Sequence, residues 1–337
     1  MAHFKSKQLG RYVDQFKSKS ILVVGDLILD SYIWGKVNRI SPEAPVPVLN
    51  IQKEEFVLGG AANLAHNLST LGAQVTLCGY VGKDNNAKVL LKNIKNSKIN
   101  PQGIIITSEK PTIKKTRLIA DRQQIVRIDE EDASSLSKND FQKIKLFLGK
   151  TWNEYDAVII SDYAKGTIDE NLLNQIHDLK RKKDKFISVD PKERNFHLYK
   201  NISLLTPNEK EASYFSGIHI ENEITLIKAG EKILDLTQCE NLVITLGAQG
   251  MAWFDQKKGY FKLPTFTREV FDVSGAGDTA IAVLTLSFCA HIPTKTSLTL
   301  ANAAAGIVVQ KMGTAAIHSE ELKNYIHSFK PKVDLSL

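Results

Sequence analysis

The stretch FDVSGAGDTA, residues 271–280, places a run of small residues between two aspartates. Gly275, Ala276 and Gly277 are small enough to let the backbone approach an anion, and an apolar helical run begins here. Helix N-termini carry free N–H groups and a positive partial charge, so they bind phosphates. Asp278 falls in the first helical turn, beside the bound charge. The stretch therefore predicts an anion hole with a carboxylate next to it.

A carboxylate beside an anion hole repels a bound phosphate unless it has another task, such as accepting the proton of an attacking hydroxyl. Phosphoryl transfer needs donors for the charge on the moving group and a proton acceptor in line with the nucleophile. Asp278 is therefore a candidate catalytic base. The alternative is ordinary acidic placement in a first helical turn, which the helix dipole favours.

Two stretches nearer the start of the chain carry polar groups suited to a polyol. In GGAANLAHNLSTLG, residues 59–72, glycines open a helix, and the Asn63 carboxamide can both donate to and accept from sugar hydroxyls. In GDLILD, Asp26 and Asp30 lie at or past the carboxyl end of a strand. Tight helix packing in the first stretch and a turn or helix cap in the second are the alternatives.

Two later stretches suit a metal and a nucleotide. Asn208 and Glu211 in TPNEKEA are three residues apart and share one face if a helix begins there. Oxygen ligands at this spacing suit a magnesium ion held mostly through water, and a helix cap with Glu at the third position is the rival. ITLGAQG, residues 244–250, joins a strand to glycines that let backbone pass close to a nucleotide, although alone it is only a turn.

The elements that position these residues follow from the apolar pattern. Near-continuous apolar strands alternate with helical patterns, which implies a mainly parallel sheet covered on both faces. In such sheets ligands bind beyond the carboxyl ends of the strands. We predict one three-layer, doubly wound α/β domain over residues 1–337. Its strands are expected at residues 21–26, 75–82, 156–163, 186–191, 203–208 and 241–247, and its helices at residues 60–71, 169–183, 223–236 and 275–290.

Two excursions, residues 31–58 and 103–130, interrupt this alternation. The second contains short segments of alternating polar and apolar residues, such as TIKKTRLIA, which suit half-exposed strands. We predict a small antiparallel β lid formed by the two excursions, and a pair of decorated surface loops is the alternative.

Composition narrows the class of protein. The 337 residues carry a formal net charge of +7, but the lysines are scattered, which favours an anionic small molecule over nucleic acid. The three cysteines lack the spacing of a zinc site or a disulfide framework. No signal peptide and no apolar segment of bilayer-spanning length is visible. We expect a cytoplasmic protein that binds neither nucleic acid nor membrane.

In combination, GGAANLAHNLSTLG and DVSGAGDT resemble the two signatures of the ribokinase-like (PfkB) carbohydrate kinase family. GDLILD, TPNEKE, ITLGAQG and ANAAAG follow in the family's order, so the resemblance covers residues 20–328. It implies a sugar kinase that uses ATP and Mg²⁺, with a monovalent cation left open. A homodimer that pairs the lids of two subunits is also implied, and exposed strand edges on a lid make it physically reasonable.

A narrower resemblance rests on RISPEAPVPV, residues 39–48, together with SDYAKG, DPK and LLTPNEKE. This combination is similar to the heptose 7-phosphate kinases of Gram-negative bacteria. Those enzymes phosphorylate the anomeric hydroxyl of D-glycero-D-manno-heptose 7-phosphate on the route to ADP-heptose and lipopolysaccharide. Some members fuse the kinase to a nucleotidyltransferase, and because this chain stops at Leu337 we expect the single-function form.

The family resemblance also implies a role for each matching residue. Asp278 would be the base, and Gly275, Ala276 and Gly277 the anion hole. The sugar would be bound by Asp30, Gly59, Gly60 and Asn63. Magnesium and the phosphates would be held by Asn208 and Glu211. The nucleotide site would be lined by Thr245, Gly247, Gly250 and Asn302.

A substrate that arrives with a phosphate needs cations at the far end of its site. Lys165 and Lys192 follow strand ends, and Arg117 and Arg122 lie in the second excursion, so these four are the candidates. Arginine's planar fork suits a terminal phosphate better than an ammonium does, and solvated surface charge is the alternative.

Two rival functions stay open. One is a kinase for another sugar or sugar phosphate, such as fructose, ribose or tagatose 6-phosphate. The other is a catalytically silent sugar or nucleotide sensor on the same fold, although a sensor has no need of a base aimed at a transferred group.

Overall fold

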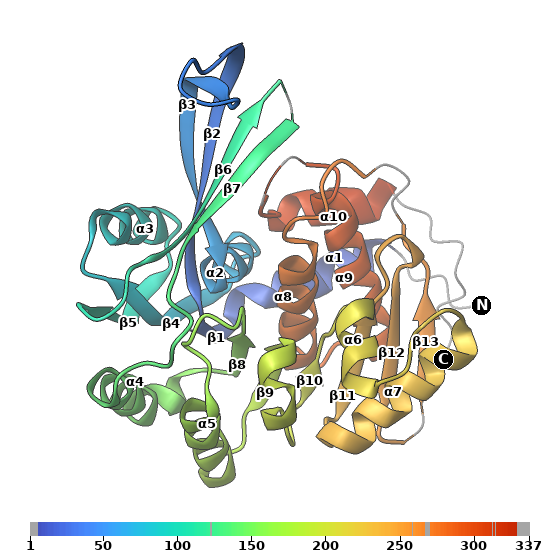
Figure 1. The fold of residues 1–337 in the computed structure, drawn as a ribbon. Helices are drawn as coiled ribbons and strands as arrows, with labels where there is room; N and C mark the ends of the chain where they lie inside the picture. The colour runs from blue at the N-terminus through green and yellow to red at the C-terminus, as the bar shows by residue number, and fades with distance from the viewer. Residues whose placement is uncertain are drawn as a thin grey trace.

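The computed structural model describes residues 6–121, 123–257, 259–266, 270–311, 313 and 315–328. Helices cover both faces of a large sheet, and a small second sheet projects from one end of this body as the lid (Figure 1). The predicted α/β fold class with a small lid sheet is therefore confirmed. None of the helices that the described residues form combines the length and the apolar character needed to cross a bilayer.

The large sheet is parallel through its centre and antiparallel at one edge. From β11 to β5 neighbouring strands pair in parallel, while β12 pairs antiparallel with both β11 and β13. Five of the six predicted strands agree with the structure to within two residues at each end, and the sixth is reduced to β10. In sheet order the strands are β13 (Tyr260–Leu263), β12 (Met251–Asp255), β11 (Asn241–Thr245), β10 (Leu204–Leu205), β9 (Phe186–Asp190), β8 (Ala157–Ser161), β1 (Ser20–Gly25), β4 (Gln74–Gly82) and β5 (Asn100–Thr107).

Two hydrophobic cores lie on opposite faces of this sheet, because successive side chains of a strand point to opposite sides. In β1, Ile21 and Val23 belong to one core, and Leu22 and Val24 belong to the other. The first core packs α1 (Ser6–Asp14), α2 (Ala61–Thr70), α3 (Asn85–Asn96), α8 (Ala276–Cys289), α9 (Thr294–Val308) and α10 (Ser319–Ser328). The second packs α4 (Lys138–Thr151), α5 (Glu170–Lys182), α6 (Glu209–Ser216) and α7 (Glu223–Thr237).

The lid sheet has the strand order β3-β2-β6-β7, formed by β2 (Leu27–Ile40), β3 (Pro47–Gly60), β6 (Ile113–Ala120) and β7 (Gln123–Glu130). Its two hairpins are antiparallel, but β2 and β6 join them in parallel. The prediction that residues 103–130 all belong to the lid was wrong at its start. Residues 103–107 form most of β5, which pairs with β4 at the edge of the large sheet.

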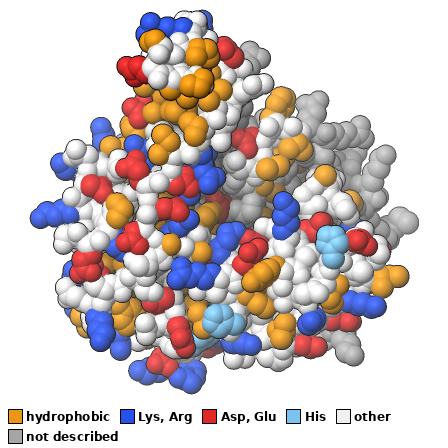
Figure 2. Space-filling view, viewed as in Figure 1, with side chains coloured by type: hydrophobic (Ala, Val, Ile, Leu, Met, Phe, Trp, Pro, Cys, Tyr) orange, Lys and Arg blue, Asp and Glu red, His pale blue; other side chains and the backbone are white. Residues whose placement is uncertain are grey.

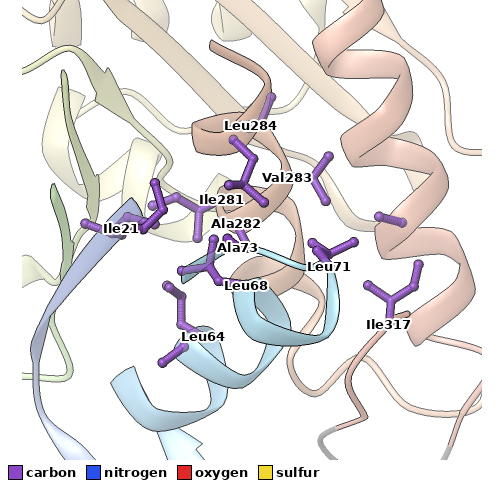
Figure 3. Packing of buried hydrophobic residues seen from close by; sticks show 14 of the residues in the cluster. Ile21, Leu64, Leu68, Leu71, Ala73, Ile281, Ala282, Val283, Leu284 and Ile317 are labelled. Atoms are coloured by element: carbon purple, nitrogen blue, oxygen red, sulfur yellow. The ribbon is translucent and has the colours of Figure 1, made fainter. Parts of the chain in front are cut away.

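Helices α2 and α8 pack against each other in the first core, and this contact positions the site. Leu68 of α2 lies beside Ile281 and Ala282 of α8 (Figure 3). Residues 278–287 of α8 are all buried, so the helix has little freedom to shift or rotate. The first turns of both helices are thereby fixed close together at one end of the sheet.

Candidate active site

Asp278 lies in the first turn of α8 and is only 5% exposed. Asn63, in the first turn of α2, donates from Nδ2 to Asp278 Oδ2 at 2.6 Å. The hydroxyl of Tyr163, in the loop after β8, donates to Asp278 Oδ1 at 3.0 Å. The packing of α2 on α8 therefore fixes the carboxylate with one donor on each oxygen.

Burial raises the pKa of Asp278 from its ordinary value to about 6. The hydrogen bonds from Asn63 and Tyr163 favour the charged form and oppose this rise, while the charge of Asp30 adds to it. A carboxylate with a pKa near 6 is a better proton acceptor than an ordinary aspartate, and it is still mostly ionised at neutral pH.

The pocket in front of Asp278 has a volume of about 150 Å³. Gly275 and Gly277 of the predicted anion hole line it, at the helix end where the first N–H groups have no intrahelical acceptor. A Cβ on Gly277 would meet nothing within 4 Å, so the approach to this helix end is open. The remaining lining residues are Tyr163, Asp190, Lys192, Thr206, Asn208, Glu211 and Thr245. The pocket thus combines the free N–H groups of a helix N-terminus, a buried carboxylate and the ammonium group of Lys192.

The predicted sugar-binding residues meet where the lid joins the body. Gly59 has no room for a side chain, because a Cβ there would lie 2.4 Å from Asp30 Oδ2. Gly60 has φ 55°, and a Cβ on it would lie 2.5 Å from the Asp26 carbonyl oxygen. The buried Oδ1 of Asn63 has no hydrogen-bond partner in the described part of the chain, so it can accept from a ligand hydroxyl.

Two interpretations were open for Asp26, a polyol ligand and a helix or turn cap, and the structure decides between them. It is fully buried, and its carboxylate accepts from the backbone N–H groups of Tyr163, Lys165 and Thr167 at 2.9–3.0 Å. These bonds hold the loop after β8 against the end of β1. The alternative interpretation, a turn-capping aspartate, is the correct one.

Three of the four predicted phosphate-binding cations lie in the described residues, and each has an acidic partner there. Arg117 Nη1 donates to Asp30 Oδ1 at 2.6 Å, and its guanidinium carbon lies 5.1 Å from the ring centroid of Tyr32. Lys165 Nζ donates at 2.5 Å to Glu131, which directly follows the lid strand β7. Lys192 donates to Glu211 and lines the Asp278 pocket. Arg122 lies outside the described residues.

Asn208 and Glu211 form a capping box at the start of α6, which was the rival interpretation of their spacing. Asn208 Oδ1 accepts from the Glu211 N–H, and Glu211 Oε2 accepts from the Asn208 N–H, both at 3.0 Å. The Asn208 oxygen therefore already accepts one hydrogen bond within the cap. Glu211 still presents Oε1 to Lys192 inside the pocket, so it can serve both the helix and a ligand.

The pocket offers oxygen ligands of the kind that magnesium prefers. Asp190 and Glu211 both line it, and burial together with the charges of Asp278 and Glu211 raises the pKa of Asp190 well above its ordinary value. A cation placed here would relieve that repulsion. No group of three His, Cys, Asp or Glu side chains with metal-site geometry occurs among the described residues. The residues fit an ion held mainly by water and phosphate.

The predicted nucleotide-site residues lie around the end of β11. Thr245 lines the pocket and forms an isolated β-bridge with Asn208. Gly247 begins the short 3-10 helix that follows, and Gly250 comes directly after it. Asn302 is different: it is 3% exposed and donates to the Pro264 carbonyl at 2.8 Å, and it does not line this pocket. Its side chain anchors the segment after β13.

Residue-level reasoning missed Tyr163 and Asp190 as site residues. Tyr163 lies two residues after the buried strand β8, in SDYAKG, and Asp190 is the last residue of β9, in DPK; both line the Asp278 pocket. The rule that ligands bind beyond the carboxyl ends of parallel strands would have found them.

Comparison with known proteins agrees with this geometry. A family model described as pfkB family carbohydrate kinase matches residues 18–321. Bifunctional protein HldE of Desulfatibacillum aliphaticivorans is 42% identical over 92% of this chain, and the chain spans 64% of that protein's length. Bifunctional protein HldE of Helicobacter pylori strain HPAG1 is 42% identical over 94% of this chain, which spans 68% of that protein.

Solved structures support the fold. Arabidopsis thaliana ribokinase in complex with ribose and ATP matches with a TM-score of 0.73 at 19% identity, covering 91% of this chain and 98% of the other. Escherichia coli phosphofructokinase-2, in complex with substrates and products, matches with a TM-score of 0.76 at 18% identity, covering 92% and 99%.

Proposed function

Since the chain belongs to the pfkB family of carbohydrate kinases, we propose that it transfers the γ-phosphate of ATP to the anomeric hydroxyl of D-glycero-D-manno-heptose 7-phosphate. The observation that carries the kinase chemistry is the buried Asp278 carboxylate beside the open N-terminus of α8. The heptose is supported by 42% identity to proteins named HldE and by the stretch RISPEAPVPV.

The mechanism follows from charge and position. The first-turn N–H groups at Gly275 to Gly277 bind the transferred phosphoryl group, and the sugar hydroxyl lies between it and Asp278. Asp278 orients this hydroxyl and accepts its proton late, as formation of the O–P bond makes the hydroxyl more acidic. The anomeric hydroxyl is already more acidic than a simple alcohol, which eases the transfer.

Other residues of the chain hold the reactants. Asn63, with its free carboxamide oxygen, and Asp30 bind sugar hydroxyls, and Lys192 stabilises charge on the phosphates. Asp190 and Glu211 would hold a magnesium ion, mainly through water, and the ion would supply further neutralisation of phosphate charge. We assign two cations where the lid joins the body, Arg117 and Lys165, to the 7-phosphate of the substrate. The phosphate would compete with Asp30 for Arg117 and with Glu131 for Lys165.

We further propose a homodimer and a cytoplasmic location. Ile40, Val46 and Ile51 on one hairpin of the lid, and Ile125 and Ile128 on the other, are 47–64% exposed. Orange side chains gather on the lid in Figure 2, and a second lid is the partner that would cover such a surface. ATP and phosphorylated sugars are cytoplasmic metabolites, which supports the location.

The test is coupled ADP release with D-glycero-D-manno-heptose 7-phosphate, run beside unphosphorylated heptose, fructose 6-phosphate, ribose and a no-sugar control, with and without magnesium. Strong preference for the heptose phosphate supports the proposal, and equal efficiency on unphosphorylated heptose overturns the assignment of the 7-phosphate cations. Activity on another sugar alone keeps the role of Asp278 but removes the heptose. No sugar-dependent ADP release on any substrate would favour a sensor.

A further inference from the structure

Tyr163 contacts the base of the proposed reaction, although no sequence pattern assigned it a role. Its hydroxyl donates to Asp278 Oδ1 at 3.0 Å, opposite the bond from Asn63 to Oδ2. We propose that Tyr163 is a positioning residue that holds Asp278 oriented and ionised for proton acceptance. This inference rests on the proposed kinase mechanism and adds a residue to it.

The loop that carries Tyr163 is built to hold it still. Asp26 accepts from three N–H groups of this loop, including that of Tyr163 itself at 2.9 Å. On the other side, the buried Asp162 accepts from the Ala164 N–H at 2.6 Å and from Asn195 Nδ2 at 2.7 Å. Two buried carboxylates therefore fix the loop backbone, so the phenol reaches Asp278 from a rigid support.

The charges around Asp278 show why a neutral donor suits this position. The ionisable groups that face it are Asp30 from β2, Tyr163 from the loop after β8, Asp190 and Lys192 from the end of β9, and Glu211 from α6. Burial and the charge of Asp30 favour protonation of Asp278, and the charge of Lys192 only partly opposes them, so the pKa of Asp278 is raised. A phenol donor stabilises the ionised form of Asp278. A permanent positive charge in its place would lower the pKa of Asp278 further and make it a weaker proton acceptor.

Tyr163 also stays a donor over the whole working range of pH. Burial and the neighbouring charge of Asp278 raise the pKa of Tyr163 well above its ordinary value. In the reaction, the sugar oxygen forms a bond to the γ-phosphorus, the bond from phosphorus to the leaving ADP oxygen breaks, and the hydroxyl proton moves to Asp278. Each oxygen of Asp278 has one donor and a remaining lone pair, so the proton has a place to bind.

The first test is the pH profile of kcat/KM for Tyr163→Phe, from pH 5 to pH 9, with the best sugar substrate of the wild-type enzyme. Loss of a donor to the charged form raises the pKa of Asp278, so we expect the acid limb to move up by about one pH unit. Relative to the wild type, kcat/KM of Tyr163→Phe should be about tenfold lower at acidic pH, where Asp278 is mostly protonated in both proteins, and nearly equal above pH 8. Tyr260→Phe, which removes a 2.8 Å bond to Glu223 at the β13 edge, should leave the limb in place.

A second readout needs no substrate and separates this inference from the proposed function. The ¹³Cγ resonance of Asp278, assigned by its loss in Asp278→Asn, is titrated in the wild type and in Tyr163→Phe, with thermal melting as the check of folding. An upward shift in the Asp278 pKa supports the inference even if no sugar is turned over. An unchanged Asp278 pKa, or a pH-independent loss of activity, overturns it and leaves Tyr163 a packing residue.

Discussion

Asp278 is the residue on which the proposed reaction depends, and asparagine tests it with almost no change of shape. The substitution keeps an oxygen that can accept from Asn63 but removes the group that accepts the proton. We expect turnover by Asp278→Asn to fall at least ~10²-fold. Sugar binding, measured by calorimetry without nucleotide, should stay close to that of the wild type. Comparable turnover in the variant would remove Asp278 from the mechanism.

The same substitution should affect stability in a pH-dependent way. The folded protein raises the pKa of Asp278 from 3.8 to about 6, so it prefers the neutral form. The cost of the ionised form is absent below about pH 4, grows as the pH rises, and reaches about 3 kcal/mol above pH 7. Asp278→Asn should therefore unfold at a higher temperature than the wild type at pH 8 and at nearly the same temperature at pH 4. Equal differences at both pH values would contradict this expectation.

Residue roles could be predicted where their chemistry is local. The small residues before Asp278 indicated an anion hole because a helix N-terminus is defined by its own few residues. Tyr163 could not be assigned in this way, since it meets Asp278 across 115 residues of chain. For Asp26 the sequence left two interpretations open for a related reason. A carboxylate at a strand end serves a sugar or a loop backbone equally well, and only the path of a distant loop decides between them.

Helix α6 carries Glu211, one of the two residues of the proposed magnesium site. Gln at position 211 can still accept from the Asn208 N–H, as the capping box allows, but it loses the charge that faces Lys192. We expect Glu211→Gln to raise the Mg²⁺ concentration for half-maximal rate by about tenfold, with the helix intact by circular dichroism. The control is Asn208→Ser, which keeps an N-cap and leaves Glu211 in place. An equal Mg²⁺ requirement in both variants and the wild type would exclude Glu211 from the metal site.

At the level of elements, the strands and helices of the large sheet were predictable, because each buries its own apolar pattern. The lid was predictable as half-exposed strands, but its pairing was not. Residues 103–107, GIIIT, form a short apolar run that fits an edge strand of the large sheet as well as a lid strand. The parallel contact of β2 with β6 depends on where the rest of the fold places them.

The whole molecule is expected to be a dimer through its lid. Ile128 of β7 is 48% exposed, and a glutamate there would place a charge inside the proposed interface. We expect Ile128→Glu to halve the mass measured by light scattering after size exclusion. The matched control is Ile224→Glu on α7, an isoleucine that is 67% exposed on the body. A monomeric wild type, or loss of the dimer in both variants, would argue against lid pairing.

The parallel pairing of β2 with β6 also constrains how the chain folds. During synthesis the β2–β3 hairpin can form once residue 60 has been made. The other neighbour of β2 is β6, which begins only at residue 113, after β4 and β5. Closing this long loop is entropically costly until the large sheet brings the two segments together. During synthesis the first half of the lid therefore waits with an unpaired edge, and in refolding the lid should be among the last segments to gain protection from hydrogen exchange.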